Sequence, residues 1–291
     1  MSEERKGELM VVLLCLLESS FPVLSIIVIE KVGALFSYAI VIAIAGAVLL
    51  TLLAHRRALP SLFQPAAQRD LLLTAFFITL LFALMFLGLR YTTAGNAAVI
   101  IFLQLCFAYL YFNVLGPERL TPLHSAGAAL MGFGALVMLW PESLRFNPGD
   151  LLILSAAAVA PLANLYQKRA RKHVGSLTIL TYRNLIALPV IVALAWGFEP
   201  LPLLSEVSAV LPQLLAIALL VYVAAKLLWV EALHRISITK ISALTALLPL
   251  FTLVLAYAVL DEVPSLRQLL GILPILVGGY WITRPSAASA S

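Results

Sequence analysis

This chain is a succession of apolar runs of about 20 residues, which short polar breaks separate from one end to the other. A run of that length crosses the hydrocarbon layer of a bilayer as one α-helix, because a helix rises about 1.5 Å per residue. Of the 291 residues, 63% are hydrophobic and only 11% are charged, whereas roughly a quarter of residues are charged in soluble domains. The runs are therefore predicted to be membrane spans, and the fold class to be an all-α membrane protein.

Ten transmembrane helices are predicted, and proline or glycine residues mark many of the breaks between them. No cleavable signal peptide is expected, because the polar N-terminal residues lead directly into a full-length span. The small, polar tail at 285–291 is expected to be disordered. The predicted spans are Glu8–Ile29, Ala34–Ala54, Asp70–Leu89, Ala94–Leu115, Pro122–Trp140, Gly149–Tyr166, Ser176–Trp196, Leu211–Leu233, Ile238–Leu260 and Ser265–Thr283.

Lysine and arginine residues gather in alternate loops, which indicates how the spans are oriented. With a cytoplasmic N-terminus, thirteen of the nineteen basic residues lie at the inner face and four lie outside. This bias predicts that both termini are cytoplasmic, that the number of spans is even, and that the protein lies in a bacterial or archaeal cytoplasmic membrane. The thirteen are Arg5, Lys6, Arg56, Arg57, Arg69, Arg119, Lys168, Arg169, Arg171, Lys172, Arg235, Lys240 and Arg284.

An internal repeat aligns the two halves of the chain. At an offset of 144 residues, Glu118 pairs with Glu262, Gly127 with Gly271 and Gly134 with Gly278. Each half holds five predicted spans, so residues 1–145 are expected to form a first five-helix repeat and residues 146–284 a second. An odd number of spans in each repeat places the two copies in opposite orientations, which is the inverted-repeat design of secondary transporters with a central cavity.

Several functional classes have no support in the sequence. The net charge of +5 is not arranged as a basic stripe with interleaved aromatic residues, so no nucleic-acid partner is expected. Cys15 and Cys106 both lie inside apolar spans, so neither a disulfide framework nor a metal site is expected. There is no Walker-type glycine motif and no nucleophile–base pair, so we expect neither ATP-driven transport nor an enzyme, and no cofactor.

Glu18 lies near the middle of the apolar run Leu13–Ile29. A carboxylate at that depth costs about 3 kcal/mol on insertion scales, so it is normally paired, neutralised or turned to a wet cavity. On a helix, Glu18 shares a face with Ser25. The functional interpretation is a carboxylate that binds a proton and a cationic substrate in turn. The alternative is a structural carboxylate held by the serines that follow it or by Lys226.

Lys226 is the other charge that lies deep in a span, and Tyr222 and Trp229 fall on the same predicted helical stripe. It could contact an anionic or zwitterionic substrate, or pair with Glu18 and release it during a transport cycle. The alternative is a lysine that extends toward the membrane interface. Arg183 is counted nearer the cytoplasmic side, and an interfacial or inter-helix anchor is expected there.

Neutral polar residues recur at helical spacing in other spans. Asn96 and Gln104 share a face of one span, Thr245 lies on its repeat partner, and Asn164 aligns with Ser25. These polar faces are expected to meet across a midplane cavity, although hydrogen bonds between helices would explain them equally well. The candidate substrate-binding residues are Glu18, Ser25, Asn96, Gln104, Asn164, Tyr222, Lys226, Trp229 and Thr245.

The chain resembles the drug/metabolite transporter superfamily, of the ten-helix EamA type. The resemblance is carried by two stretches, GPERLTPLHSAGAALMGFGALVML and LDEVPSLRQLLGILPILVGGYWI, in which an acidic residue precedes a turn and a last span that contains glycine. The motif ALLPLF and the stretch YRNLIAL also fit the second family repeat. The resemblance implies ten transmembrane helices in two inverted repeats, a central cavity and alternating access for small solutes or metabolites, often as export.

The chain also departs from that pattern. The first repeat has Gln104 and Leu105 where a proline is expected, and it has no counterpart of Arg183. Glu18 is unusual for this family type and is similar to the essential glutamate of the small multidrug resistance proteins, four-helix relatives that exchange protons for cationic substrates. That second resemblance is loose.

The leading hypothesis is therefore a secondary active transporter that exports small organic solutes by alternating access, with protons as the candidate coupling ion through Glu18. The alternative is an uncoupled facilitator or channel for small solutes. The expected partners are the lipid bilayer and a small-molecule substrate. The sequence leaves the substrate open, and it leaves the oligomeric state open between a monomer and a homodimer.

Overall fold

The computed structural model describes residues 3–114, 122–139, 147–229, 245 and 247–282, and all regular structure in these residues is helical. The tail at 285–291 and the first part of the predicted span Ile238–Leu260 lie outside them. Seven described helices are long and apolar enough to cross a bilayer, and two shorter apolar helices, Leu247–Leu260 and Leu266–Trp281, accompany them. The protein is an all-helical integral membrane protein.

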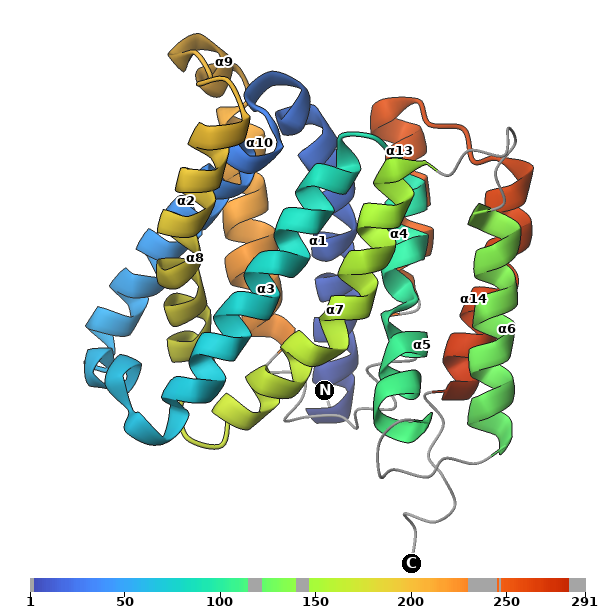
Figure 1. Ribbon diagram of the computed structural model, residues 1–291, viewed down its shortest axis with the longest axis horizontal. Coiled ribbons are helices and arrows are strands. Elements are labelled where there is room, and N and C mark those ends of the chain that lie inside the picture. Colours follow the sequence, from blue (N-terminus) through green and yellow to red (C-terminus); the bar gives the residue numbers. More distant parts are fainter. Residues whose placement is uncertain (1–2, 115–121, 140–146, 230–244, 246, 283–291) are drawn as a thin grey trace, which may run out of the picture.

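The helices of the first half follow the predicted spans to within a few residues at most ends, because apolar runs and polar breaks fix where a span can begin and end. The first helix extends beyond its apolar run at both ends. In order, the helices are α1 Glu3–Val32, α2 Ala34–His55, two 3₁₀ turns at Leu59–Phe63 and Pro65–Ala67, α3 Gln68–Leu89, α4 Ala94–Phe102, α5 Gln104–Tyr109, a π-helix Leu110–Val114 and α6 Pro122–Leu139 (Figure 1).

The second half adds one short helix, α9, in a connection where no helix was expected. In order, the helices are α7 Pro148–Ala170, α8 Ser176–Phe198, α9 Leu204–Ala209, α10 Leu211–Ala216, the π-helix η4 Ile217–Ala225, α13 Leu247–Leu260 and α14 Leu266–Ile282.

The start of α7 shows how local sequence fixes a helix end. The side chain of Asn147 accepts a hydrogen bond from the backbone N–H of Gly149, and Pro148 occupies the first helical position. Asp150 in the first turn and Lys168 in the last turn complement the helix dipole. The helix therefore begins one residue before the predicted span.

The span predicted at 94–115 is interrupted rather than continuous. The backbone N–H of Leu103 bonds to the carbonyl of Ile100, three residues back, and α5 begins only at Gln104. The apolar pattern continues across this break, so hydropathy alone gives no sign of it. Hydropathy also gives no sign of the π-helix η4. It occupies Ile217–Ala225, the middle of the predicted span Leu211–Leu233.

Two helix pairs approach closely at glycines and run antiparallel. On α6 and α14, a Cβ added to Gly134 would lie 2.6 Å from the carbonyl oxygen of Gly271, and one added to Gly278 would meet the carbonyl of Gly127. On α3 and α7, a Cβ added to Gly149 would lie 2.7 Å from the carbonyl oxygen of Gly88. Small residues at such contacts let two membrane helices pack backbone to backbone.

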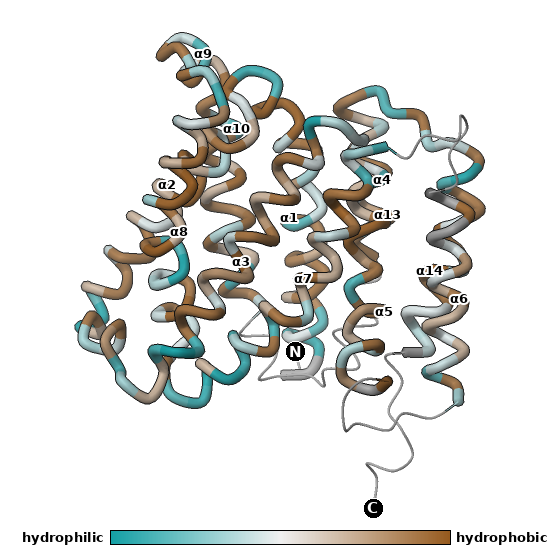
Figure 2. Tube along the Cα trace, viewed as in Figure 1, coloured by the Kyte–Doolittle hydropathy of each residue, from teal (hydrophilic) through white to brown (hydrophobic). Residues whose placement is uncertain are grey.

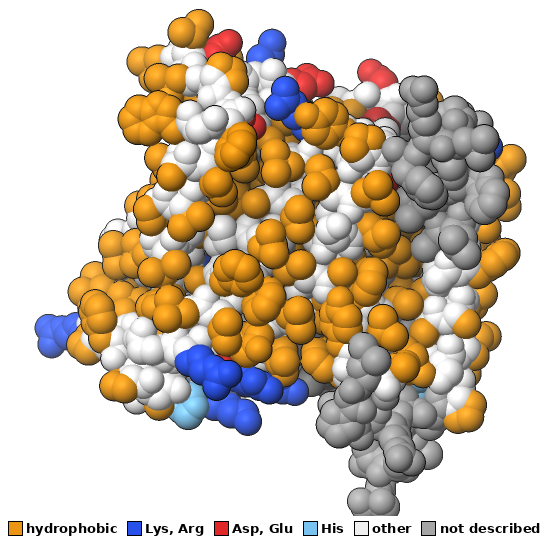
Figure 3. All heavy atoms as spheres, viewed as in Figure 1, with side chains coloured by type: hydrophobic (Ala, Val, Ile, Leu, Met, Phe, Trp, Pro, Cys, Tyr) orange, Lys and Arg blue, Asp and Glu red, His pale blue; other side chains and the backbone are white. Residues whose placement is uncertain are grey.

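The outside of the bundle is apolar around its middle and polar at its ends. Along the trace, most hydrophilic segments lie at the two ends of the helices (Figure 2). Hydrophobic side chains cover most of the visible face. Lysine and arginine side chains gather at its lower end, and acidic side chains, with a few basic ones beside them, lie at its upper end (Figure 3). The start of α1 and the end of α14 lie at that same lower end (Figure 1). We call the two ends the basic end and the acidic end.

Candidate functional site

Glu18 and Lys226 form an ion pair between α1 and the residue that follows η4. The ammonium of Lys226 donates to Oε1 of Glu18, and the side chains are 26% and 20% exposed, respectively. The serines after Glu18 do not hold its carboxylate, because the hydroxyls of Ser19 and Ser20 donate to carbonyls of their own helix, Leu16 and Leu17. Of the partners considered for Glu18, the structure therefore selects Lys226.

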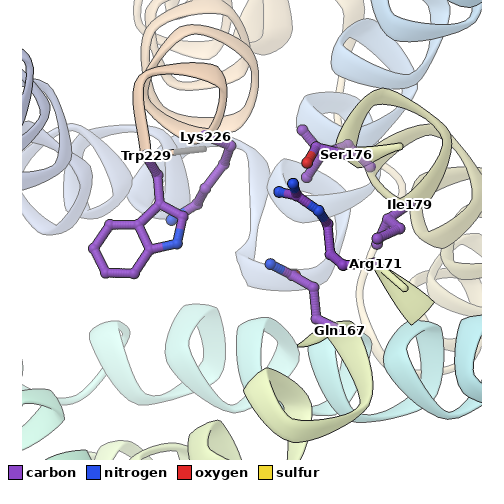
Figure 4. A pocket seen from close by; sticks show the side chains of 7 residues that line it. Gln167, Arg171, Ser176, Ile179, Lys226 and Trp229 are labelled. Atoms are coloured by element: carbon purple, nitrogen blue, oxygen red, sulfur yellow. The ribbon is translucent and has the colours of Figure 1, made fainter. Parts of the chain in front are cut away.

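A small pocket of about 20 Å³ adjoins Lys226 on the side of the basic end. It is lined by Gln167 and Arg171 at the end of α7, by the first turns of α8, and by Lys226 and Trp229. Lys226 and Trp229 enter it from one side, and the side chains of α7 and α8 face them from the other (Figure 4). This volume is about that of one or two water molecules, so the pocket is too small for an organic solute.

Beyond Lys226, five aromatic side chains pack into a layer across the centre of the bundle. They come from four helices: Phe21 on α1, Tyr38 on α2, Phe82 and Phe86 on α3, and Tyr222 on η4. Their ring centroids lie as close as 4.8 Å, between Phe82 and Tyr222, and all five side chains are buried. We call this group the aromatic layer. Offset and edge-to-face contacts of this kind make a dense core.

Buried polar groups adjoin the aromatic layer without hydrogen-bond partners among the described residues. Arg183 on α8 is only 2% exposed, and its Nε and Nη2 have no partner. The same is true of Nδ2 of Asn184 and of the hydroxyl of Tyr222. Tyr222, Tyr38 and Glu18 are the titratable groups that act electrostatically on the Arg183 guanidinium. Buried polar groups are nearly always satisfied in proteins, so each exception calls for an explanation.

A larger pocket of about 660 Å³ opens at the acidic end. It is lined by the last turns of α1, by Leu89 and Arg90 after α3, by the connection from α8 to α9, and by Glu262 after α13. Along α1, the order from this pocket inward is Ile29 and Ile26 at its wall, Phe21 in the aromatic layer, and then Glu18. The two pockets thus lie on opposite sides of the aromatic layer.

Two carboxylates at this end cap helices of the opposite half of the chain. Glu199, which follows α8, accepts hydrogen bonds from the backbone N–H groups of Ala34, Leu35 and Phe36 at 2.9 to 3.1 Å. Three first-turn donors of α2 are thereby satisfied, and the negative charge lies at the positive end of the helix dipole. Gly33 makes the approach possible, because its φ is +88° and a Cβ there would lie 2.6 Å from the carboxylate.

Glu262 does the same for α4, accepting from the backbone N–H groups of Ala94 and Gly95. Glu118, the counterpart of Glu262 in the repeat, lies outside the described residues.

Of the other predicted site residues, Asn96 lies in a hydrogen-bonded network at the acidic end. Its amide donates to Asp150 at 3.4 Å, and its Oδ1 accepts from Gln268 at 2.6 Å. Thr92 also donates to Asp150. The structure thus gives Asn96 the alternative role that was considered for it, hydrogen bonding between helices. Neither Asn96 nor Gln104 lines either of the two pockets.

The remaining candidates are distributed through the bundle. Ser25 is fully buried and its hydroxyl has no partner among the described residues. Asn164 is exposed on α7. Thr245 is partly buried and takes part in an interaction. Lys226 and Trp229 share the small pocket, whereas Tyr222, four residues before Lys226, lies in the aromatic layer.

Arg183 is the residue whose position sequence reasoning missed. An interfacial position was one expectation for it, and its burial excludes that. Arg183 follows Ser176, the first residue of α8, by about two helical turns, and the helix continues for about four more turns after it. Arg183 therefore lies inside the span and not at its end. Charged residues inside a membrane span are functional by default, and this rule was applied to Glu18. The same rule would have made Arg183 a candidate site residue.

Comparisons with known proteins agree with this architecture. The EamA-like transporter family matches the chain twice, over residues 5–140 and 147–284. An uncharacterized transporter of Archaeoglobus fulgidus is 28% identical over 71% of this chain and 72% of its own length. A protein of Streptantibioticus cattleyicolor, named "Probable terminal-alkyne amino-acid exporter", is 28% identical over 63% of this chain and 62% of its own length.

Two further comparisons extend the picture. The uncharacterized transporter YyaM of Bacillus subtilis is 24% identical over 67% of this chain and 66% of its own length. One solved crystal structure has the same fold, with a TM-score of 0.67 at 20% identity over 96% of both chains. Because the family match covers nearly the whole sequence, the chain belongs to the EamA-like transporter family.

Proposed function

We propose that this protein is a secondary active transporter that exports small organic solutes by alternating access. Family membership supports the class, and the bilayer and a small-molecule substrate are its partners. A relative named as an amino-acid exporter supports organic solutes as cargo and export as the direction. The observation that carries the mechanism is the pair of pockets on opposite sides of one packed aromatic layer.

The two pockets differ in the way that alternating access requires. About 660 Å³ is open at the acidic end, whereas about 20 Å³ remains at the basic end. Among the described residues, the solute-sized pocket opens at the acidic end, and the aromatic layer and the Glu18–Lys226 pair lie between it and the small pocket. A channel in its conducting state has a continuous path, so this arrangement favours a carrier over a facilitator or channel.

We further propose ten spans in two inverted five-helix repeats, residues 1–145 and 146–284. The same family matches each half of the chain. The sequence repeat equates Gly127 with Gly271 and Gly134 with Gly278, while the contacts join Gly127 to Gly278 and Gly134 to Gly271. Each half thus offers the equivalent glycine to the other, as expected for two copies related by a two-fold axis.

The basic end is proposed to face the cytoplasm of a bacterial or archaeal cell. Exposed Arg56, Arg57, Arg69, Lys168 and Arg169 lie at the ends of helices there, in agreement with the positive-inside rule. The open pocket then faces outward, and both termini are cytoplasmic.

Proton coupling is proposed to run through Glu18. The ammonium of Lys226 donates to the carboxylate of Glu18, and protonation of Glu18 would remove the negative charge that holds the pair and free the ammonium. Rearrangement of α1 against η4 would follow, because the pair joins these two elements across the bundle. The pair is partly exposed beside the small pocket, so a proton can reach it from the basic end.

The test is uptake into proteoliposomes that contain the full-length protein. A mixture of amino acids, organic acids, amines and sugars is loaded outside, a pH gradient is imposed, and the solutes accumulated inside are identified by mass spectrometry. Accumulation above the equilibrium level that depends on the gradient supports coupled transport, and Glu18→Gln should abolish the dependence while leaving the protein folded. Equilibration without accumulation would instead favour a facilitator.

A further inference from the structure

We propose that Arg183, with the hydroxyl of Tyr222, forms a binding subsite for the carboxylate of a transported organic solute. This inference rests on the proposed transport function and adds the chemical class of the cargo. It starts from the guanidinium of Arg183, which is buried inside a membrane protein with Nε and Nη2 unpartnered among the described residues. An arginine in that condition is costly unless something binds it for part of the functional cycle.

The charges around the aromatic layer leave one positive charge uncompensated. Glu18, Lys226 and Arg183 lie next to the aromatic layer and carry charges of −1, +1 and +1, and Arg171 is a further basic residue at the wall of the small pocket. Lys226 pairs with the carboxylate of Glu18 by direct contact. Arg183 has Glu18 as an electrostatic partner at a distance but no ion pair of its own among the described residues. A bound monoanion would balance the charge of Arg183.

The donors near Arg183 suit a carboxylate. A guanidinium presents parallel N–H groups that match two carboxylate oxygens, and such charge-assisted bonds are about twice as strong as neutral ones. Tyr222 is 1% exposed, its hydroxyl has no partner among the described residues, and it interacts electrostatically with Arg183, so it offers a further donor to a carboxylate bound there. The aromatic rings alongside offer apolar contact to the rest of the solute.

The subsite lies directly behind the small pocket. On α8, Arg183 follows Ile179, a wall residue of the pocket, by one helical turn. On the opposite side, Tyr222 precedes Lys226, another wall residue, in the same helical segment. An opening of the bundle between the small pocket and Arg183 would therefore join the pocket to the guanidinium. A solute that leaves or enters at the basic end would meet Lys226 first and Arg183 next.

The test is ligand-dependent thermal stability of the full-length protein in lipid nanodiscs. The probes are butyrate, benzoate, L-leucine and L-phenylalanine, each compared with its own carboxamide, and inorganic phosphate. A ligand that binds only the folded state raises the melting temperature in proportion to its affinity. At least one carboxylate should raise the melting temperature, and its carboxamide should bind about tenfold or more weakly because the charge-assisted bonds are lost.

Variants assign the effect to the proposed residues. Arg183→Gln should abolish carboxylate binding, and Arg183→Lys should weaken it about tenfold because the bidentate geometry is lost. Tyr222→Phe should also weaken binding by about tenfold, while the unliganded melting temperature stays the same or rises, because the hydroxyl has no partner to lose. This second variant keeps the proposal testable if Arg183→Gln fails to fold.

Two matched controls make the same chemical changes elsewhere. Arg56→Gln removes a charge from an exposed arginine at the basic end, and Tyr257→Phe removes a hydroxyl from the exposed face of α13. Both should bind the carboxylates as the parent does. Binding within twofold of the parent in Arg183→Gln and Tyr222→Phe, equal binding of carboxamides, or a response to phosphate alone would each overturn the proposal.

The outcome also separates this inference from the proposed function. Proteoliposomes that accumulate amines or sugars, with no carboxylate binding, would leave a transporter without the anionic subsite. Carboxylate binding that depends on Arg183 and Tyr222, with no accumulation of those carboxylates in proteoliposomes, would retain the subsite and reject the transport function.

Discussion

Glu18 and Lys226 lie 208 residues apart in the sequence and form one ion pair that ties α1 to the helical segment of η4. The pair lies between the small pocket and the aromatic layer, and it is partly exposed. Its energy should fall between that of a surface pair and that of a fully buried pair, because some screening by water remains.

The first prediction concerns that pair. Glu18→Gln and Lys226→Met should each destabilise the protein by roughly 1–3 kcal/mol, because each strands a charge away from bulk water. The double variant should lose less folding stability than the two single variants together, because neither charge is then left without its partner. Melting temperatures in nanodiscs at one pH measure all four forms. Simple additivity would mean that the two side chains do not interact in the folded protein.

A second prediction concerns carboxylates that cap helices at the acidic end. Glu199 accepts from three backbone N–H groups, Glu262 from two and Glu206 from one. Replacing each glutamate with glutamine removes the charge and leaves one acceptor oxygen. The loss of folding stability should therefore be largest for Glu199→Gln, at about 1–2 kcal/mol, smaller for Glu262→Gln and smallest for Glu206→Gln. Thermal unfolding of the three variants measures the order. A larger loss for Glu206→Gln than for Glu199→Gln would contradict the capping argument.

A third prediction concerns orientation. In a background with Cys15 and Cys106 replaced by alanine, a cysteine at Leu204, which is 84% exposed at the acidic end, should react with a membrane-impermeant maleimide in intact cells. A cysteine at the exposed Arg56 should react only after the membrane is opened, because the basic end faces the cytoplasm. Labelling of Arg56→Cys in intact cells would reverse the proposed orientation.

Sequence reasoning found the helices well because the cost of burying polar backbone and charge in lipid fixes where a span can begin and end. It could not find the break at Leu103 or the π-helix η4, because both change the backbone hydrogen-bond register without changing hydropathy. It could not settle the role of Asn96 either. That residue is in the first turn of α4, and only the fold brings Asp150 and Gln268 to it.

The central site was predictable in part for a related reason. Glu18 and Lys226 stand out as charges in apolar runs, and their pairing, one of the roles considered for Lys226, is the contact that the structure shows. The depth of Arg183 depends on where α8 begins relative to the bundle, which residue counting gives only to within a turn. The aromatic layer is assembled from the first three helices and from η4 in the second half of the chain, and no local pattern reveals it.

The last prediction concerns the contact of α6 with α14. Gly134→Ala should destabilise the protein by about 1–3 kcal/mol, because the new Cβ would lie 2.6 Å from the backbone carbonyl of Gly271 and neither backbone can move away cheaply. Gly132, two residues earlier on the same helix, is the matched control, since a Cβ there meets nothing within 4 Å. Gly132→Ala should be neutral or stabilise by up to about 1 kcal/mol through its better helix propensity. Melting temperatures in nanodiscs compare the two variants. Equal stability of Gly134→Ala and Gly132→Ala would mean that the two helices do not meet backbone to backbone at this position.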